Sequence, residues 1–141
     1  MNKICPKCAA DPTSHSFKKV SDKGATTVYY THPSKAKLYD DLEGILMHVD
    51  NMLTLQGNKP WICIMDGDGF DMKHAAQIKL GVDLMDLIMN KHGTHLKEFK
   101  VINPTWHING QMALGKATLT PEIYSKIVIL DDRKHSILEF I

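Results

Sequence analysis

Short apolar runs alternate with amphipathic stretches along most of this chain. The run WICIM at residues 61–65 is continuous and has turn-forming residues on both sides, which is typical of a strand buried on both faces of a parallel sheet. Two more apolar runs, EFKVIN at 98–103 and KIVIL at 126–130, predict further strands. The β-branched and aromatic stretch TTVYYT at 26–31 predicts a fourth.

Helical periodicity occupies the segments between these strands. Apolar residues recur with a helical period from Leu38 to Leu53, and Ser34 is placed to cap the start of that helix. A second helix is expected over about 72–91 and a shorter one over 107–117. Alternating strands and helices predict parallel strands with right-handed crossovers. The expected fold class is therefore α/β, with a small, mostly parallel sheet in a three-layer or partly open arrangement.

Composition narrows the function classes. The chain has 141 residues, the size of one domain, and its 17 Lys and Arg nearly balance its 16 Asp and Glu. No bulk attraction to nucleic acid is implied, so no nucleic-acid partner is expected. No apolar run approaches the roughly 20 residues that a transmembrane helix needs, and the N-terminus MNKICPKC has no secretory signal. We expect a cytoplasmic or other intracellular protein with reduced cysteines.

The loop after the 61–65 run, with Asp66, Gly67, Asp68 and Gly69, allows three interpretations. An aspartate pair after a buried strand resembles the haloacid dehalogenase phosphatases, in which Asp66 would attack phosphorus and Asp68 would protonate the leaving group. In that interpretation the acidic residues of IVILDD, at 127–132, would hold Mg²⁺. An EF-hand calcium loop fails, because its glycine would stand at the wrong loop position. A structural turn, with glycines at positive φ and aspartates capping free N–H groups, is the favoured interpretation.

The N-terminal segment contains a metal-type pattern. Cys5 and Cys8 form the Cys-x₂-Cys spacing that tetrahedral zinc sites use. His15 follows, and His32 is our preferred fourth ligand over the weaker candidates His48 and Asp11. A structural zinc would order a segment with little hydrophobic content. We therefore divide the chain into a zinc-type N-terminal segment, 1–33, and an α/β domain, 34–141; two surface cysteines or a redox pair are the alternatives.

Three sequence blocks, in the same order and at similar spacing, resemble the CRAL-TRIO lipid-binding domain. The first is a strand ending in Asp66 with Gly69 and Phe70 shortly after it. The second is VINP at 101–104, and the third is the KI strand at 126–130. The resemblance covers roughly residues 48–130. It indicates a minimal, truncated version of the domain, without the preceding helical lobe or the final helix and strand.

The resemblance implies non-catalytic binding, and possible transfer, of a lipid or other lipophilic molecule in an apolar pocket. It also implies transient contact with a membrane surface, while the oligomeric state is left open. A segment after Pro104 would cover the pocket, with Gly110 and Gly115 as hinges and Leu114 among its apolar residues. The triplet His92-Gly93-Thr94 lacks the glutamate with which phosphoinositide-binding members pair the KI lysine. The expected ligand-binding residues are Met65, Phe70, Ile102, Trp106, Ile108, Met112 and Lys126.

Two functions of other classes compete with lipid binding. One is the Mg²⁺-dependent phosphatase that would use Asp66 and Asp68. The other is a zinc-bearing protein-interaction module that keeps the fold without a ligand pocket.

Overall fold

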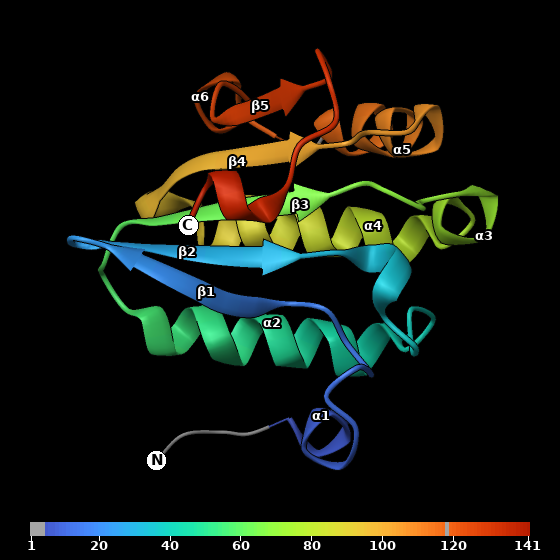
Figure 1. Ribbon diagram of the computed structural model, residues 1–141, viewed down its shortest axis with the longest axis horizontal. Coiled ribbons are helices and arrows are strands. Elements are labelled where there is room, and N and C mark those ends of the chain that lie inside the picture. The colour runs from blue at the N-terminus through green and yellow to red at the C-terminus, as the bar shows by residue number, and fades with distance from the viewer. Residues whose placement is uncertain (1–4, 118) are drawn as a thin grey trace.

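A five-stranded sheet organises the protein. The computed structural model describes residues 5–117 and 119–141. Its strands stand side by side in chain order: β1 (Lys18–Lys23), β2 (Thr26–Thr31), β3 (Trp61–Asp66), β4 (Leu96–Ile102) and β5 (Ile127–Leu130) (Figure 1). Strands β2 to β5 are parallel, whereas β1 is antiparallel to β2. The predicted α/β fold with a mostly parallel sheet is confirmed, as are the four predicted strands.

Of the five strands, β1 is the one that the apolar pattern did not predict. Its sequence KKVSDK is mainly polar, and its register with β2 shifts between Lys19 and Ser21. A charged, irregular edge strand is a common protection against sheet-to-sheet aggregation. The boundary that we expected after residue 33 leaves β1 and β2 on one side and β3 on the other. Strand β2 pairs with β3, so one sheet continues across this boundary.

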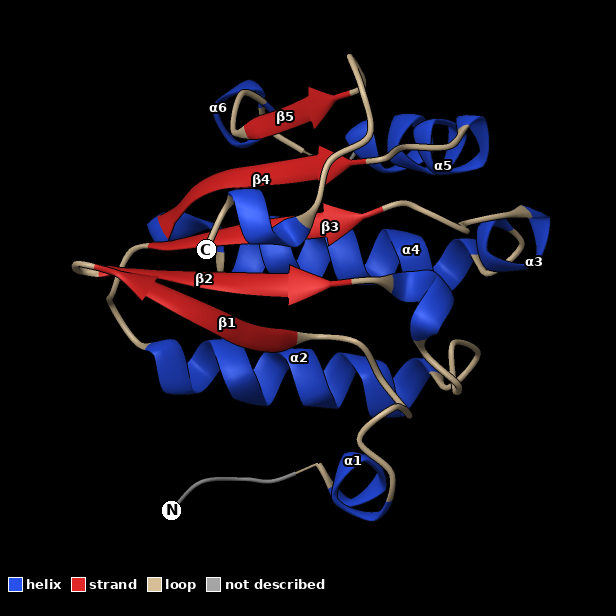
Figure 2. Ribbon diagram, viewed as in Figure 1, coloured by secondary structure: helices blue, strands red, loops and turns tan. Residues whose placement is uncertain are grey.

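Most helices cover one face of this sheet. Adjacent parallel strands joined by right-handed crossovers place successive helices on the same side. Figure 2 shows the helices in blue beside the red strands, and in Figure 1 α4 runs behind β3. The α-helices are α1 (Pro6–Ala10), α2 (Leu42–Gln56), α3 (Met72–Ala75), α4 (Ile78–Met85), α5 (Trp106–Lys116) and α6 (Pro121–Tyr124).

Helix α2 begins later than the sequence predicted. Its N-cap is Asp41, whose side chain accepts a hydrogen bond from the Gly44 backbone N–H. A Cβ at position 44 would collide with the Asp41 carboxylate, so glycine permits this cap. Ser34, the expected cap, instead lies in a 3₁₀ turn, Pro33–Lys35, and donates to the Asp68 carbonyl at 2.6 Å.

The single helix expected over 72–91 is three segments. Helix α3 begins with a capping box between Asp71 and His74 and is only four residues long, and α4 begins after Gln77. A π-helical turn, Asp86–Lys91, follows directly. The neighbouring side chains Ile88 and Met89 are both buried in this turn.

Strand alternation divides the apolar core between the two faces of the sheet. The face that packs on α2 and α4, here called the helix face, presents Tyr29, Trp61, Cys63 and Phe99. The second face presents Val28, Ile64 and Ile102, which pack against Ile137 and Phe140 of the C-terminal segment. That segment ends in a 3₁₀ turn, Ile137–Glu139, which lies in front of the strands in Figure 1. Each face is therefore apolar and covered, but by different parts of the chain.

Candidate ligand pocket and metal-binding cluster

An apolar pocket lies between the helix face and the helices. Its floor includes Met65 and Phe99, and its walls come from α2, α4, the π-helical turn and α5. The space open to the centre of a water molecule is about 80 Å³. Pockets for drug-sized ligands occupy roughly 300–1,000 Å³. In this conformation the pocket admits a small apolar group, and a larger ligand requires one wall to move.

Helix α5 forms the cover of the pocket. Ile108 and Met112, one helical turn apart, line the pocket, and Ile108 is 1% exposed. Trp106 and Leu114, also expected to contribute to the cover, point outward and are 73% and 57% exposed. Thr105 fixes the start of the helix, because its hydroxyl accepts from the Ile108 N–H and donates to the Phe70 carbonyl. Only one side of α5 therefore faces a ligand.

Four of the seven expected ligand-binding residues lie outside this pocket. Phe70 is buried against the His74 ring, with 5.2 Å between ring centroids. Ile102 points to the second face because side chains alternate along β4. Lys126 donates to the Gly93 carbonyl at 2.7 Å, and Trp106 stacks on His107. Met65, Ile108 and Met112 are the three that line it.

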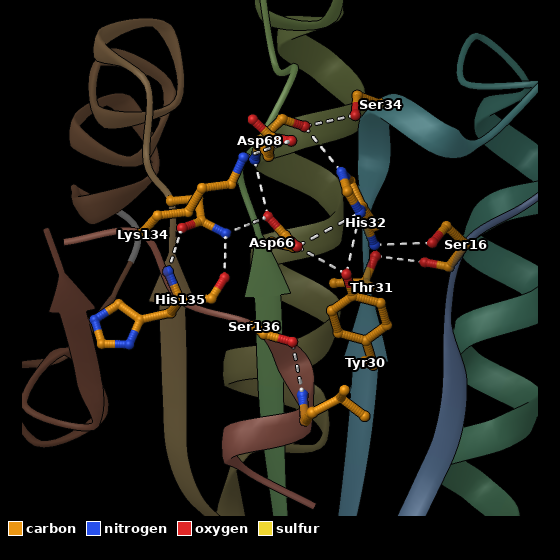
Figure 3. A network of polar contacts seen from close by, with 12 residues as sticks. Ser16, Tyr30, Thr31, His32, Ser34, Asp66, Asp68, Lys134, His135 and Ser136 are labelled. Atoms are coloured by element: carbon orange, nitrogen blue, oxygen red, sulfur yellow. Dashed lines mark hydrogen bonds and ion pairs between the residues drawn. The ribbon is translucent and has the colours of Figure 1, made fainter.

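The aspartate loop after β3 is the centre of a polar network (Figure 3). Asp66 Oδ1 accepts from the Asp68 N–H and from the Asn103 side-chain amide, each at 3.0 Å. Its Oδ2 accepts from the Tyr30 hydroxyl at 2.8 Å, and His32 Nδ1 lies 3.5 Å away. Burial, together with the bond to Asp66, raises the pKa of Tyr30, so Tyr30 stays a donor. Both carboxylate oxygens of Asp66 are thus occupied.

This network does not suit phosphoryl transfer. Asp66 follows Met65, which faces the pocket, and points to the opposite face of the sheet. Gly67 lies so close to the chain after β4 that a Cβ there would be 2.9 Å from the Asn103 carbonyl oxygen. Within residues 5–117 and 119–141, no group of three or more carboxylates has the geometry to hold a cation. The arrangement matches the structural interpretation of the loop.

A second polar cluster joins the N-terminal segment to helix α2. Donor atoms of Cys5, Cys8, His15 and His48 all lie within 4.8 Å of one another and could bind a metal. Cys5 Sγ is 3.5 Å from His15 Nδ1. Burial lowers the pKa of His48, which keeps its imidazole neutral as a ligand requires. The structure thus gathers three of the four predicted ligands and substitutes one.

His48 takes the place that the sequence analysis assigned to His32. The His32 ring is turned toward the aspartate loop, where Nε2 lies 2.9 Å from the Asp68 carbonyl oxygen and Nδ1 3.0 Å from the Tyr30 hydroxyl. It is therefore committed to the aspartate-loop network. Asp11, the other weak candidate, caps Thr13 and pairs with Lys37 at 3.0 Å. His48 was ranked below His32 because linear spacing does not show that a separate helix brings it to the cysteines.

Comparison with known proteins identifies the fold and the family. The family described as CRAL/TRIO domain matches residues 21–141. The chain belongs to the CRAL/TRIO family. Among solved structures, the CRAL/TRIO chain is similar to the crystal structure of a protein named Sfh5, with a TM-score of 0.63 and 13% sequence identity. The match covers 88% of this chain and 51% of that one, so the chain spans about half the length of the structure it resembles.

Family membership bears on function at a general level. Among curated proteins, no relative matches the sequence. Membership in the CRAL/TRIO family supports binding of a lipophilic ligand in general, and is consistent with a protein that is not an enzyme. Within the described residues, no helix has the length and apolar character needed to cross a bilayer.

Proposed function

We propose that the protein binds a lipophilic small molecule in the pocket beneath α5, without catalysing a reaction. The observation that carries this proposal is an apolar pocket, lined by Met65, Ile108 and Met112, between the helix face and α5 in a CRAL/TRIO chain. Apolar ligands are held by removal of their surface from water, which contributes about 0.8 kcal/mol per buried methylene. The ligand we propose is therefore a molecule with a long apolar chain.

Growth of the pocket to ligand size requires α5 to move. A Cβ at Gly81 of α4 would lie 2.5 Å from the Gln111 side chain, so glycine allows the two helices to approach closely. Gln111 also donates to the Gln77 carbonyl at 3.3 Å, a long bond that is readily broken. Movement of a covering helix on the microsecond-to-millisecond timescale is a common way to admit ligands.

Displacement of a fluorescent long-chain fatty acid by unlabelled fatty acids of increasing length tests this proposal. Affinity should rise about fourfold per added methylene until the pocket is full. Met112→Gln, which places an amide in the pocket, should weaken binding. The matched control is Leu114→Gln on the exposed side of α5, which should leave binding unchanged. If no lipid class displaced the probe, or if both variants weakened binding equally, the proposal would be wrong.

Transfer between membranes forms a separate part of the proposal. Trp106 is a large aromatic residue, 73% exposed, at the start of the helix that covers the pocket. Tryptophan is favoured at membrane–water interfaces, because one part of its ring is apolar and the other polar. Trp106→Ala should slow transfer of a fluorescent fatty acid between vesicles and leave its equilibrium affinity unchanged. An unaltered transfer rate would contradict this role.

Zinc is the metal we propose for the N-terminal cluster. Two thiolates and two imidazoles form a tetrahedral donor set that zinc prefers. Such a set requires reduced thiols, which fits an intracellular, reducing compartment. If zinc were bound while every apolar probe failed, the zinc-bearing interaction module would replace lipid binding as the proposed function.

A further inference from the structure

One atom of the N-terminal cluster lacks a partner. His48 Nδ1 is buried, and no hydrogen bond reaches it from any described residue. The other ring nitrogen, Nε2, lies 2.8 Å from the Phe17 carbonyl oxygen and must donate to it, because a carbonyl only accepts. Nδ1 of the neutral ring therefore carries a free lone pair. A buried lone pair without a hydrogen-bond donor calls for another kind of partner.

The neighbours of that lone pair are metal-ligating groups. His48 Nδ1 belongs to a cluster whose donor atoms lie within 4.8 Å of one another. Zinc–sulfur and zinc–nitrogen bond lengths place the ligand atoms of a tetrahedral site about 3.3–3.8 Å apart. The 3.5 Å between Cys5 Sγ and His15 Nδ1 already lies in that range. Because the remaining donor-atom distances are at most 4.8 Å, a contraction of up to about 1 Å would complete the site.

Both histidines are oriented in the same way. His15 directs Nδ1 at Cys5 and Nε2 at Asp41 Oδ2, which is 2.9 Å away. A carboxylate or carbonyl acceptor on the outer nitrogen is the usual support of a metal-ligating imidazole, because it fixes the tautomer and the ring plane. Asp41 supplies that acceptor to His15, and the Phe17 carbonyl supplies it to His48. Asp41 also caps helix α2, so its position is fixed independently of the cluster.

The cluster and the pocket share side chains. His15 and His48 line the pocket as well as the cluster, whereas Cys5 and Cys8 belong to the cluster alone. Phe17, two residues after His15, also lines the pocket and stacks on Tyr29 with 5.1 Å between centroids. A metal at the cluster would therefore fix one wall of the pocket through its two imidazoles.

We infer that zinc bound by Cys5, Cys8, His15 and His48 is a built-in part of the pocket wall, and that the affinity for an apolar ligand depends on it. Only the dependence of ligand affinity on zinc rests on the proposed lipid-binding function; the metal site itself does not. Metal binding joins the segment 5–15 to α2, and so holds the Phe17 carbonyl and its ring against the pocket. Without the metal, each imidazole is held only through its outer nitrogen, His15 by Asp41 and His48 by the Phe17 carbonyl, so this wall of the pocket is less rigid.

Two measurements on the full chain test the inference. Metal content by inductively coupled plasma mass spectrometry should give one zinc per chain, and cobalt substitution should give a tetrahedral spectrum with thiolate charge-transfer bands. Cys5→Ser and His48→Ala should each lose the zinc, whereas His95→Ala, outside the cluster, should retain it. A fluorescent long-chain fatty acid is then titrated into zinc-loaded and chelator-stripped protein.

Cys5→Ser is the decisive variant for coupling, because Cys5 does not line the pocket. Affinity for the fatty-acid probe should fall about 5- to 150-fold in Cys5→Ser and in stripped wild type, the usual range for coupled sites. Re-adding zinc should restore it in the wild type alone. Stripping the wild type provides the same comparison if the variant does not fold.

Three results would overturn the inference. Unchanged zinc content and cobalt spectrum in His48→Ala would remove His48 from the site. Equal probe affinity with and without zinc would overturn the coupling alone. Failure of the zinc-loaded wild type to bind any apolar probe would overturn the coupling and the proposed lipid-binding function together.

Discussion

Asp66→Asn removes a negative charge from the network of Figure 3 while keeping the shape of the side chain. Asp66 is buried, and its carboxylate accepts hydrogen bonds from Asp68, Asn103 and Tyr30. Asparagine offers one oxygen in place of two. Its oxygen should therefore stay with the two N–H donors of Asp68 and Asn103, and its amide nitrogen should face Tyr30.

The cost follows from how Tyr30 can respond. Its hydroxyl can accept from the new amide if it donates its own hydrogen to His32 Nδ1, 3.0 Å away. One charge-assisted hydrogen bond then becomes a neutral one, and the other two lose their charge assistance. Hydrogen bonds to charged groups contribute about 1.5–3 kcal/mol and neutral ones about 0.5–1.5. A loss of about 1 kcal/mol for each of the three bonds gives an expected fall of about 3 kcal/mol in the free energy of unfolding.

Urea titration followed by far-ultraviolet circular dichroism measures this loss. Asp68→Asn is the matched control, because the Asp68 side chain is 56% exposed and its carboxylate lies 3.9 Å from Lys134. An exposed pair of this kind should change stability by less than about 1 kcal/mol. Equal stability of the two variants would refute the structural role of Asp66. Magnesium-dependent hydrolysis of an aryl phosphate that Asp66→Asn abolishes would instead restore the phosphatase interpretation.

Further predictions concern glycine positions and pH. Gly67→Ala should lower the free energy of unfolding by about 1–3 kcal/mol in urea titration, because its Cβ would meet the Asn103 carbonyl oxygen at 2.9 Å; unchanged stability would contradict the close approach. Gly110→Ala, with open space around the new methyl, should raise it by roughly 0.5–1 kcal/mol. Asp132, and then Glu139, raise the pKa of His135, so protonated His135 stabilises the C-terminal segment. That contribution is fully present below the ordinary value of 6.5 and is lost as pH rises through the folded value. His135→Asn should therefore lower the urea midpoint at acidic pH and not at alkaline pH; an equal loss at both would contradict it.

Strands β2 to β5 and the mostly parallel sheet were predictable from the sequence, because each strand is a short run rich in apolar or β-branched residues and helical periodicity lies between the runs. The bounds of the apolar runs agree with β3, β4 and β5 to within two residues. Strand β1 was not predictable, since KKVSDK carries no apolar alternation and is held mainly by pairing with β2. The start of α2 was also missed, because it depends on Gly44 and Asp41 meeting in space rather than on periodicity.

The candidate sites also contain residues that the sequence predicted and residues that it did not. Cys5, Cys8 and His15 are close in the sequence, so spacing was enough to gather them. His48 comes from the next helix, and its only sequence signal is its place beside the buried positions Ile45 and Val49 of α2. The aspartate loop suggested a catalytic site where the structure shows turn and cap contacts. Acidic side chains after a strand are common in both roles, so the sequence alone does not separate them.

Asn103 connects the aspartate loop and the C-terminal segment to the start of the helix that covers the pocket. Its side-chain amide donates to Asp66 and to the His135 carbonyl, and its side-chain oxygen accepts from the His135 N–H at 2.8 Å. Two residues later Thr105 caps α5. The covering helix is thus anchored at one end to a residue held on the far side of the sheet. Opening of the pocket should therefore rotate α5 about its first residues. Amide exchange in α5 should then be faster than exchange of the His135 N–H, which stays protected.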